Sequence, residues 1–265
     1  MRSGFAPVDG TRLYYEVHGE GAPVVYLPPA LGHAGARSAW SLGPGFALIT
    51  VDLQGHGRTA DREDRALSIP GHAADVVALL DHLGLERASL FGDSFGGAVA
   101  VWIAAEHPSR VDRVATYGTT FGPPVEAHDA RMLRFDAPPG PDSEGFRYQR
   151  ERFESVAPVG ASWARLWHKV VALSWSGFTD AQLARVVAPV LVALGDRDFV
   201  RLEHAVSAYR RLPQAELAVL PDAGHFALYS EPDRVVHLVR EFLTRPSARP
   251  PVATAGVGYQ PGLTR

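Results

Sequence analysis

The clearest candidate for chemistry in this 265-residue sequence is a serine flanked by glycines. Ser94 stands in the pattern Gly-x-Ser-x-Gly at residues 92–96, between apolar runs at 88–91 and 97–105. This pattern is typical of a strand that turns abruptly into a helix, where glycines leave room on both sides of the serine. The hydroxyl would lie beside the helix N-terminus, where backbone N–H groups can stabilise an anion. The pattern predicts nucleophilic attack by Ser94. The alternative is a tightly packed turn with no catalytic role.

A serine hydroxyl is protonated at neutral pH, so Ser94 needs a basic side chain and an acid that orients the base. Both follow later predicted strands: Asp198 comes after the strand at 189–195, and His225 comes after the strand at 215–220. The carboxyl ends of parallel strands share one edge of a sheet, and functional groups gather there. We therefore expect the three side chains to meet at that edge.

Two further carboxylates lie close to these positions in the sequence. Asp196 competes with Asp198 for the acid role, and we expect it to cap a turn instead. Asp93 precedes the serine but should point in a different direction, so we expect it to be a loop or pocket-edge residue.

Strands alternate with helices along most of the sequence, which predicts a parallel sheet covered on both faces. Asp9-Gly10 predicts a hairpin that pairs residues 5–8 with residues 12–17. Pro70 and Gly84 suit the start and the end of a helix. The expected strands are 5–8, 12–17, 23–27, 46–52, 88–92, 113–117, 189–195 and 215–220, and the expected helices are 70–83, 95–105, 162–173, 202–209 and 231–243.

Several motifs, taken in order, resemble the α/β-hydrolase superfamily. Residues 52–59, Asp-Leu-Gln-Gly-His-Gly-Arg-Thr, are similar to the family's Asp-x-Arg-Gly-x-Gly-x-Ser segment. Gly195-Asp196-Arg197-Asp198 and Ala223-Gly224-His225 match the segments that carry the family's acid and base, in the order Ser…Asp…His. The resemblance runs from about Leu13 to Leu243. It implies an α/β fold with a mostly parallel eight-stranded sheet, helices on both faces and a helical lid.

The resemblance and the composition together predict the domain organisation. Residues 1–120 and 188–245 should form the α/β-hydrolase core. The strand–helix alternation breaks at 121–187, where the family carries its lid, and three of the five tryptophans lie there. Residues 246–265 are rich in proline, glycine and small residues, which predicts a flexible tail.

An oxyanion hole needs two N–H donors. The resemblance implies Phe95, the residue after the serine, and Ala30, with Leu31 as the alternative to Ala30. This chain departs from the family at Pro28-Pro29, which replaces the usual His-Gly pair, and neither proline can donate. A cis bond between these prolines is possible. The lid tryptophans could cover an apolar substrate or only pack the lid onto the sheet. The expected substrate-binding residues are Leu31, His33, Trp163, Trp167 and Phe226. For His33 and also for His56, a solvated loop position is the alternative to lining the pocket.

Composition excludes several classes of function. The chain has no cysteine, which rules out disulfides and thiolate chemistry. A formal charge of −3 with no basic block predicts no nucleic-acid or membrane partner. Residues 1–10 lack a signal-peptide core and no apolar run is long enough to span a membrane, so we expect a cytoplasmic protein. No histidine spacing is typical of a catalytic metal. The glycine-rich residues 55–60 nearly fit a dinucleotide-binding fingerprint, but they precede a charged segment rather than a helix. Neither a metal nor another cofactor is therefore expected.

The sequence therefore predicts a cofactor-free serine hydrolase, present as a monomer or homodimer, that acts on a small-molecule ester or lactone of a mostly apolar acid. Hydrolysis of a carbon–carbon bond, of the meta-cleavage type, is a close alternative. A second alternative is a non-hydrolytic member of the fold that acts as a ligand receptor, lyase or cyclase.

Overall fold

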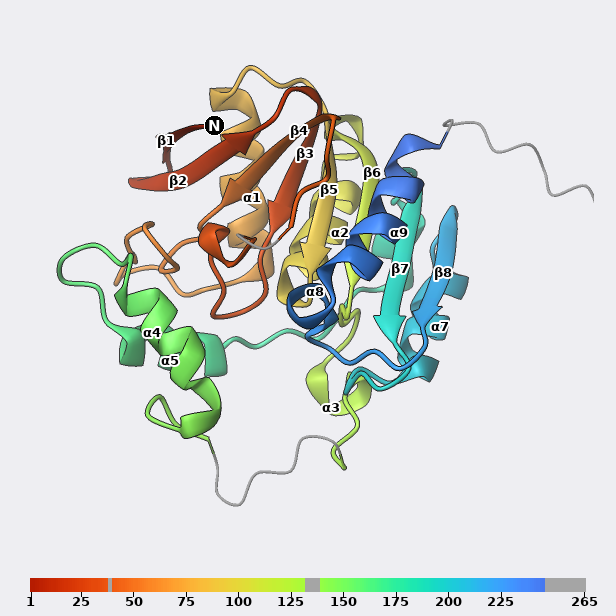
Figure 1. Cartoon of the computed structure of the whole chain (residues 1–265). Coiled ribbons are helices and arrows are strands. Elements are labelled where there is room, and N and C mark those ends of the chain that lie inside the picture. Colours follow the sequence, from red (N-terminus) through yellow and green to blue (C-terminus); the bar gives the residue numbers. More distant parts are fainter. Residues whose placement is uncertain (38–39, 132–138, 246–265) are drawn as a thin grey trace, which may run out of the picture.

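A computed structural model describes residues 1–37, 40–131 and 139–245 of the chain. The described residues form one eight-stranded sheet with the strand order β1-β2-β4-β3-β5-β6-β7-β8. Figure 1 shows the sheet running through the molecule. The strands are β1 (Arg2–Val8), β2 (Thr11–His18), β3 (Gly21–Leu27), β4 (Gly45–Val51), β5 (Ala88–Asp93), β6 (Val111–Tyr117), β7 (Val190–Gly195) and β8 (Ala215–Leu220).

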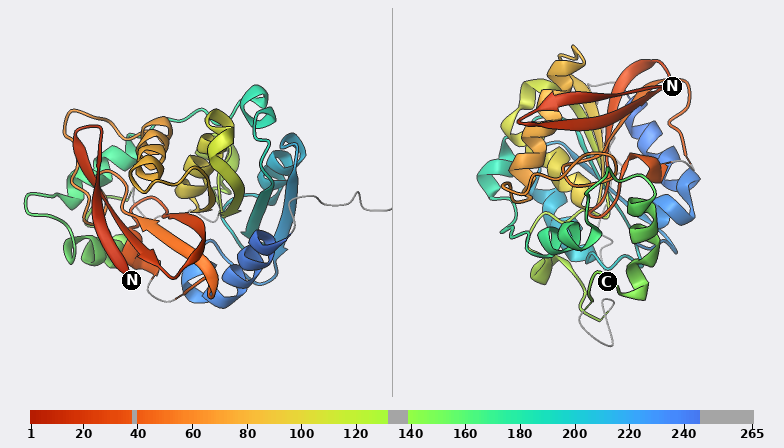
Figure 2. Two further views of the ribbon diagram at one scale, coloured as in Figure 1. Left: turned by 90° about the horizontal axis from the view of Figure 1, so that it is seen from above. Right: turned by 90° about the vertical axis from the view of Figure 1, so that its left-hand side faces the viewer.

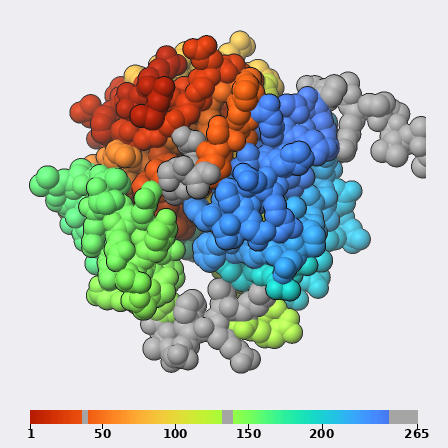
Figure 3. Space-filling view, in the orientation of Figure 1, coloured from red at the N-terminus to blue at the C-terminus, as the bar shows by residue number. Residues whose placement is uncertain are grey.

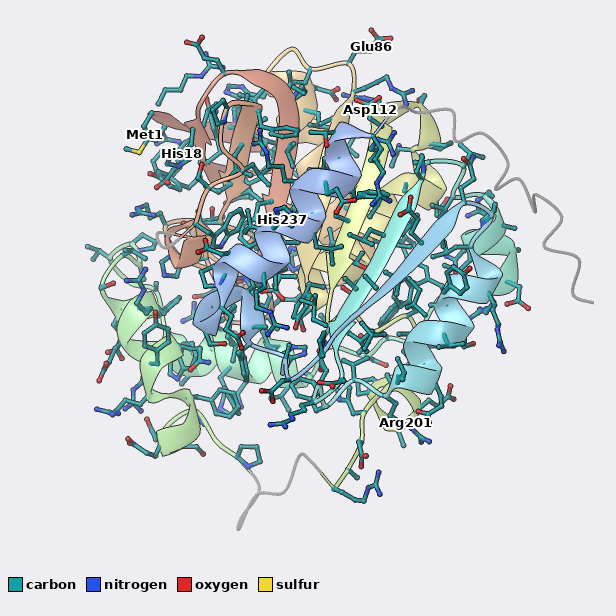
Figure 4. The ribbon with its side chains drawn as sticks, turned by 45° about the vertical axis from the view of Figure 1, so that its right-hand side comes forward. Met1, His18, Glu86, Asp112, Arg201 and His237 are labelled. Atoms are coloured by element: carbon teal, nitrogen blue, oxygen red, sulfur yellow. The ribbon has the colours of Figure 1, made fainter. Side chains whose placement is uncertain are left out.

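The sheet is parallel except at its first edge, where β1 pairs antiparallel with β2 and β2 pairs antiparallel with β4. The hairpin predicted from Asp9-Gly10 is confirmed: both residues have positive φ, and Val8 lies opposite Thr11. Because β3 to β8 are parallel, their carboxyl ends share one edge. Figure 4 shows Arg201 near that edge, and Glu86 and Asp112 near the opposite edge.

Helices cover both faces of the sheet, as expected. Helices α1, α2 and α7 contribute to a core on one face, and α8 and α9 contribute to a core on the other face. The left view of Figure 2 shows helices on either side of the strands. The helices are α1 (Ile69–His82), α2 (Phe95–Glu106), α3 (Pro124–Ala127), α4 (Arg147–Glu154), α5 (Trp163–Val171), α6 (Asp180–Ala184), α7 (Leu202–Arg211), α8 (Ala227–Ser230) and α9 (Pro232–Thr244).

The two cores follow from the alternation of side chains along the strands. In β3, Val25 and Leu27 belong to the core beneath α1 and α2, whereas Val24 and Tyr26 belong to the core beneath α9. All four side chains are fully buried. The short apolar run at 23–27 is therefore a central strand covered on both sides.

The segment between β6 and β7 carries α3, α4, α5 and α6, and Figure 1 shows α4 and α5 beside the carboxyl ends of the strands. The residues predicted to form a lid, 121–187, lie within this segment. Lys169, the one lysine in the sequence, connects α5 to the loop before α1. Its ammonium donates to Asp61 Oδ1 at 2.8 Å and to the Arg65 carbonyl oxygen at 2.9 Å. The predicted tail, residues 246–265, lies outside the described residues.

No helix within the described ranges is both long enough and apolar enough to cross a membrane.

The β5–α2 junction brings backbone segments unusually close together. A Cβ atom at Gly92 would lie 2.3 Å from the Cα atom of Gly97, and one at Gly96 would lie 2.1 Å from the carbonyl oxygen of Leu27. Ser94 itself has φ 52° and ψ −115°, a conformation that L-residues rarely adopt. The glycines of the Gly-x-Ser-x-Gly pattern are thus required by space.

We predict that Gly96→Ala lowers the free energy of unfolding by about 3 kcal/mol or more, because the new methyl group meets backbone that cannot move aside. Urea denaturation measures this change. Gly140→Ala is the matched control, since a Cβ at Gly140 would meet nothing within 4 Å, and it should change stability by less than about 1 kcal/mol. Equal effects of the two substitutions would contradict the prediction.

Candidate active site

The structure brings together the three side chains that the sequence singles out. Ser94 follows β5, Asp198 follows β7 and His225 follows β8. The Oγ of Ser94 lies 3.1 Å from Nε2 of His225, and Nδ1 of His225 lies 2.8 Å from Oδ1 of Asp198. The carboxyl ends of three parallel strands therefore place a hydroxyl, an imidazole and a carboxylate in one hydrogen-bonded line.

The surroundings of His225 fix its position. Asp198 is buried, and its Oδ1 also accepts the backbone N–H of Val200 at 2.8 Å. The ring of Phe199 lies 3.9 Å from the imidazole, measured between ring centroids. The hydroxyl of Tyr117 donates to the carbonyl oxygen of Gly224 at 2.8 Å, which ties down the loop that carries His225. With Nδ1–H donated to Asp198, Nε2 is free to accept the Ser94 proton.

The competing acid lies elsewhere. Asp196 is exposed, and its Oδ1 accepts the backbone N–H of Ala223 at 3.3 Å. Asp196 therefore stabilises the turn before His225. Within the described residues, no hydrogen bond joins Asp196 to the imidazole.

Asp93 differs from the sequence-based expectation. The sequence predicts a loop or pocket-edge residue, but Asp93 ends β5 and is 1% exposed. Its surroundings include the hydroxyls of Tyr26 and Tyr229, which lie 3.4 Å apart. Burial raises the pKa of Asp93 to about 7, although the nearby His225 opposes this shift. The correction follows from the strand: β5 continues to Asp93, so its side chain turns into the core beneath the serine.

Two cavities meet at Ser94. The smaller has a volume of about 280 Å³ and is lined by residues that include Phe95, Ala98 and Leu173. The larger has a volume of about 560 Å³ and lies between α4–α5 and the segment after His225. Figure 3 shows a hollow between these two parts of the surface. The residues that line both cavities are Ala30, Ser94, Val170 and Phe199.

The predicted oxyanion residues lie beside the serine. Ala30 lines both cavities, and Phe95 lines the smaller one. The Pro28–Pro29 bond is trans, as are the other peptide bonds of the described residues. Leu31 has φ 64°, and the Gly32 N–H donates to the Pro29 carbonyl oxygen at 2.9 Å. This loop is thus a tight turn that begins directly after β3.

Four of the five predicted substrate-binding residues line the larger cavity: Leu31, His33, Trp167 and Phe226. Trp163 does not line either cavity. Its indole N–H donates to the Pro141 carbonyl oxygen at 2.7 Å, and its ring packs against Phe153 and Trp167. Trp163 therefore belongs to the small core that holds α4 and α5 together, which corrects its assignment as a binding residue.

Two residues that the sequence did not assign to a site contribute to the cavities. Arg152, from α4, lines the larger cavity, and its Nη2 donates to the Gly35 carbonyl oxygen at 2.8 Å. No acidic side chain of the described ranges lies within ion-pair distance of it. His56 lines the smaller cavity and is 1% exposed. The sequence leaves His56 open between a pocket residue and a solvated loop histidine, and the structure places it on the cavity wall, away from solvent.

His33 and His56 are both neutral at pH 7. Burial lowers the pKa of each to about 4, and the charge of Arg152 adds to the effect at His33. Nδ1 of His33 accepts the Gly35 N–H at 3.1 Å, so its remaining proton lies on Nε2. Among the described residues, no cluster of three or more acidic or histidine side chains could hold a metal ion.

Comparison with known proteins gives the family. A family model described as alpha/beta hydrolase fold matches residues 17–157, more than half of the chain. The protein belongs to the α/β hydrolase fold family. Two relatives and one solved structure illustrate the relationship.

Over 273 residues, this α/β hydrolase is 29% identical to RutD of Caulobacter sp. (strain K31). The match covers 94% of this chain and 100% of RutD. It is 26% identical over 266 residues to the 2-hydroxy-6-oxo-6-phenylhexa-2,4-dienoate hydrolase of Burkholderia cepacia, covering 88% of this chain and 91% of that protein. The structure of Est816, described as an N-acyl homoserine lactone degrading enzyme, matches with a TM-score of 0.72 at 27% identity. That match covers 90% of this chain and 100% of Est816.

The raised pKa of Asp93 makes the hydrolase less stable as the pH rises. Between the ordinary value of 3.8 and about 7, the folded state keeps a proton that the unfolded state has released. The free energy of unfolding therefore falls with rising pH in that window. We predict that Asp93→Asn, which cannot ionise, gains stability relative to wild type between pH 4 and pH 8, by on the order of 4 kcal/mol.

Urea denaturation of both proteins at pH 4 and pH 8 tests this. Asp52, whose pKa burial raises to about 6, titrates in both proteins and cancels in the comparison. A stability difference between the two proteins that stays constant across this range would show that Asp93 does not titrate as described.

Proposed function

We propose that this α/β hydrolase cleaves a small, mostly apolar ester or lactone through an acyl-enzyme formed on Ser94. The observation that carries the proposal is the hydrogen-bonded line from Ser94 Oγ through His225 to Asp198, with distances of 3.1 and 2.8 Å. A serine rather than an aspartate at the nucleophile position favours acyl transfer over alkyl transfer.

In the proposed reaction, Ser94 Oγ attacks the substrate carbonyl carbon while its proton passes to His225 Nε2. Asp198 keeps the imidazole oriented and stabilises its protonated form. The bond between the carbonyl carbon and the leaving oxygen then breaks, and the leaving oxygen takes the proton from Nε2. Water attacks the resulting ester in the same way, with its proton taken by His225, and Ser94 Oγ recovers that proton as the acid is released.

The negative charge on the carbonyl oxygen requires backbone donors. We assign this role to the N–H groups of Phe95 and Ala30, which belong to residues that line the smaller cavity beside Ser94. Phe95 begins α2, so the helix N-terminus adds a favourable electrostatic field at that point.

The two cavities suit two parts of the substrate. The protonated His225 must reach the leaving oxygen, and His225 lines the larger cavity but not the smaller one. The leaving group therefore belongs in the larger cavity. The acyl group belongs in the smaller one, next to Phe95. Est816, whose description names lactone degradation, supports a lactone as one possible substrate type.

We predict that a fluorophosphonate labels Ser94 and that 4-nitrophenyl esters of short acids are hydrolysed. Ser94→Ala should abolish labelling and lower kcat by roughly 10³-fold or more, because the attacking oxygen is gone. Mass spectrometry of the labelled peptide and release of nitrophenolate measure the two effects. Ligand binding with neither labelling nor turnover would instead support a receptor, lyase or cyclase.

A second candidate function is hydrolysis of a carbon–carbon bond beside a ketone, with a leaving fragment that carries a carboxylate. It is favoured by Arg152, a cation on the wall of the larger cavity with no acidic partner within the described ranges. His33 also lines this cavity, and its Nε2–H has no hydrogen-bond partner among the described residues. The Burkholderia cepacia relative is named for such a dienoate substrate.

For this candidate we predict that Arg152→Met raises KM for 2-hydroxy-6-oxo-6-phenylhexa-2,4-dienoate by roughly 10-fold or more, and changes KM for 4-nitrophenyl butyrate much less. Arg147→Met on the same helix is the control, since Arg147 pairs with Glu144 and does not line the cavity. No turnover of the dienoate by the wild-type enzyme would eliminate the second candidate and leave ester hydrolysis intact.

A further inference from the structure

The larger cavity differs from the smaller one in size and in how it meets the surface. Its volume of about 560 Å³ is twice the 280 Å³ of the smaller cavity and corresponds to roughly eighteen water volumes. It reaches Ser94 and His225 at one end, and Figure 3 shows a hollow in the surface between α4–α5 and the segment after His225. The larger cavity can therefore hold a much bulkier group than the smaller one.

The wall of this cavity carries several apolar side chains that are shielded from solvent. Leu31 and Trp167 are 8% and 5% exposed, and Phe199 is half-buried against the imidazole of His225. Arg152 adds a positive charge, whereas no aspartate or glutamate of the described ranges lines the wall. A cationic leaving group would find no counter-charge here, and an uncharged apolar group would find a matching surface.

Three further side chains on the same wall are exposed. Tyr148 on α4, Val171 at the end of α5 and Phe226 directly before α8 are 63%, 66% and 57% exposed. A side chain that both lines a cavity and faces solvent lies at the mouth of that cavity. Single exposed apolar side chains are ordinary on protein surfaces, but three from separate elements around one opening form a patch. We call these three residues the apolar rim.

The rim belongs to the path that a substrate takes to the serine. The cavity that it surrounds ends at Ser94 and His225, and the leaving group is assigned to this cavity. A short alcohol would leave the rim in contact with water, whereas a long alkyl chain would cover it. Each methylene group that leaves water for an apolar surface improves binding by up to about fourfold. The continuity of rim and cavity therefore favours part of the substrate as the occupant.

We propose that the leaving group of the substrate is an uncharged, long-chain alkyl alcohol that fills the larger cavity and ends against the apolar rim. This inference rests on the proposed function and names the alcohol part of its ester. The acid part, in the smaller cavity, is short. Tyr148, Val171 and Phe226 are then specificity-determining residues for the length of the alcohol, with no role in the proton transfers of His225.

The first test compares the ethyl, butyl, hexyl and octyl esters of butyric acid, because their alcohols have nearly the same acidity. Each ester is kept below its solubility limit, and the released butyrate is measured by mass spectrometry. In the wild type, kcat/KM should rise by about twofold to fourfold for each added methylene, until the chain has passed the rim. A value of kcat/KM that does not depend on alcohol length would overturn the inference.

The second test removes part of the rim. Tyr148→Ser combined with Val171→Ser should lower the ratio of the kcat/KM values for octyl and ethyl butyrate by about fivefold or more. Phe226 is left in place, because its ring lies 5.3 Å from the imidazole of His225 between centroids. Val159→Ser is the matched control and should leave the ratio unchanged, since Val159 is fully exposed between α4 and α5 and lines neither cavity. The same ratio in the wild type and the double variant would contradict the role of the rim.

The third test lengthens the acid instead of the alcohol. The ethyl esters of hexanoic and octanoic acid should show no comparable gain over ethyl butyrate, because the smaller cavity holds the acid. A gain that follows the acid would overturn the inference. So would a rate that rises only above the solubility limit of octyl butyrate, because it would assign the rim to a lipid surface.

These outcomes are distinct from a failure of the proposed function. If the esters are hydrolysed in a Ser94-dependent way but without the expected dependence on the alcohol, only the inference fails. If no ester is hydrolysed and a fluorophosphonate does not label Ser94, the proposed function fails and the inference fails with it.

Discussion

The close approach of backbone at the β5–α2 junction is the constraint on which the rest of the site depends. Ser94 occupies a conformation whose cost is about 1–3 kcal/mol, and it is held there from β6. Its N–H donates to the Tyr117 carbonyl oxygen at 2.8 Å, and its own carbonyl oxygen accepts from Thr119 Oγ1 at 3.1 Å. Gly118, between those two residues, lies against His225: a Cβ there would be 2.8 Å from Nδ1. One neighbouring segment therefore sets the positions of both the serine and the imidazole.

Burial keeps formal charge low around the serine. His33 and His56 are neutral because the charged imidazole would lose its hydration, and Asp93 holds its proton up to about pH 7 for the same reason. In the proposed reaction, the negative charge of Asp198 thus stabilises the protonated His225, and these neutral neighbours add little charge of their own. Arg152 is the exception, and it lies on the wall of the larger cavity, on the side proposed for the leaving group.

Much of the fold could be predicted because its signals are local. The Gly-x-Ser-x-Gly pattern marks the junction, the apolar runs mark the buried strands, and Pro70 and Gly84 mark the ends of α1. The meeting of Ser94, Asp198 and His225 could also be anticipated, since each follows a parallel strand. Helix α4 could not be predicted from the sequence. Its residues, Arg-Tyr-Gln-Arg-Glu-Arg-Phe-Glu, include only Tyr148 and Phe153 as apolar side chains, so they form no apolar stripe along one face of a helix.

The remaining features depend on contacts between residues far apart in the sequence or on the identity of a single neighbouring atom. Trp163 and Trp167 are four residues apart on one helix, yet only Trp167 reaches the cavity, because Pro141 and Phe153 hold Trp163 inside the core of α4 and α5. His33 and His56 show the limit most clearly. Both are buried and neutral, but Nδ1 of His33 meets an amide N–H, whereas Nδ1 of His56 meets a carbonyl oxygen. Among the described residues, Nε2–H of the first ring has no acceptor and Nε2 of the second ring has no donor. Two histidines whose pKa values burial lowers in the same direction therefore differ in the position of their proton, and no sequence pattern distinguishes them.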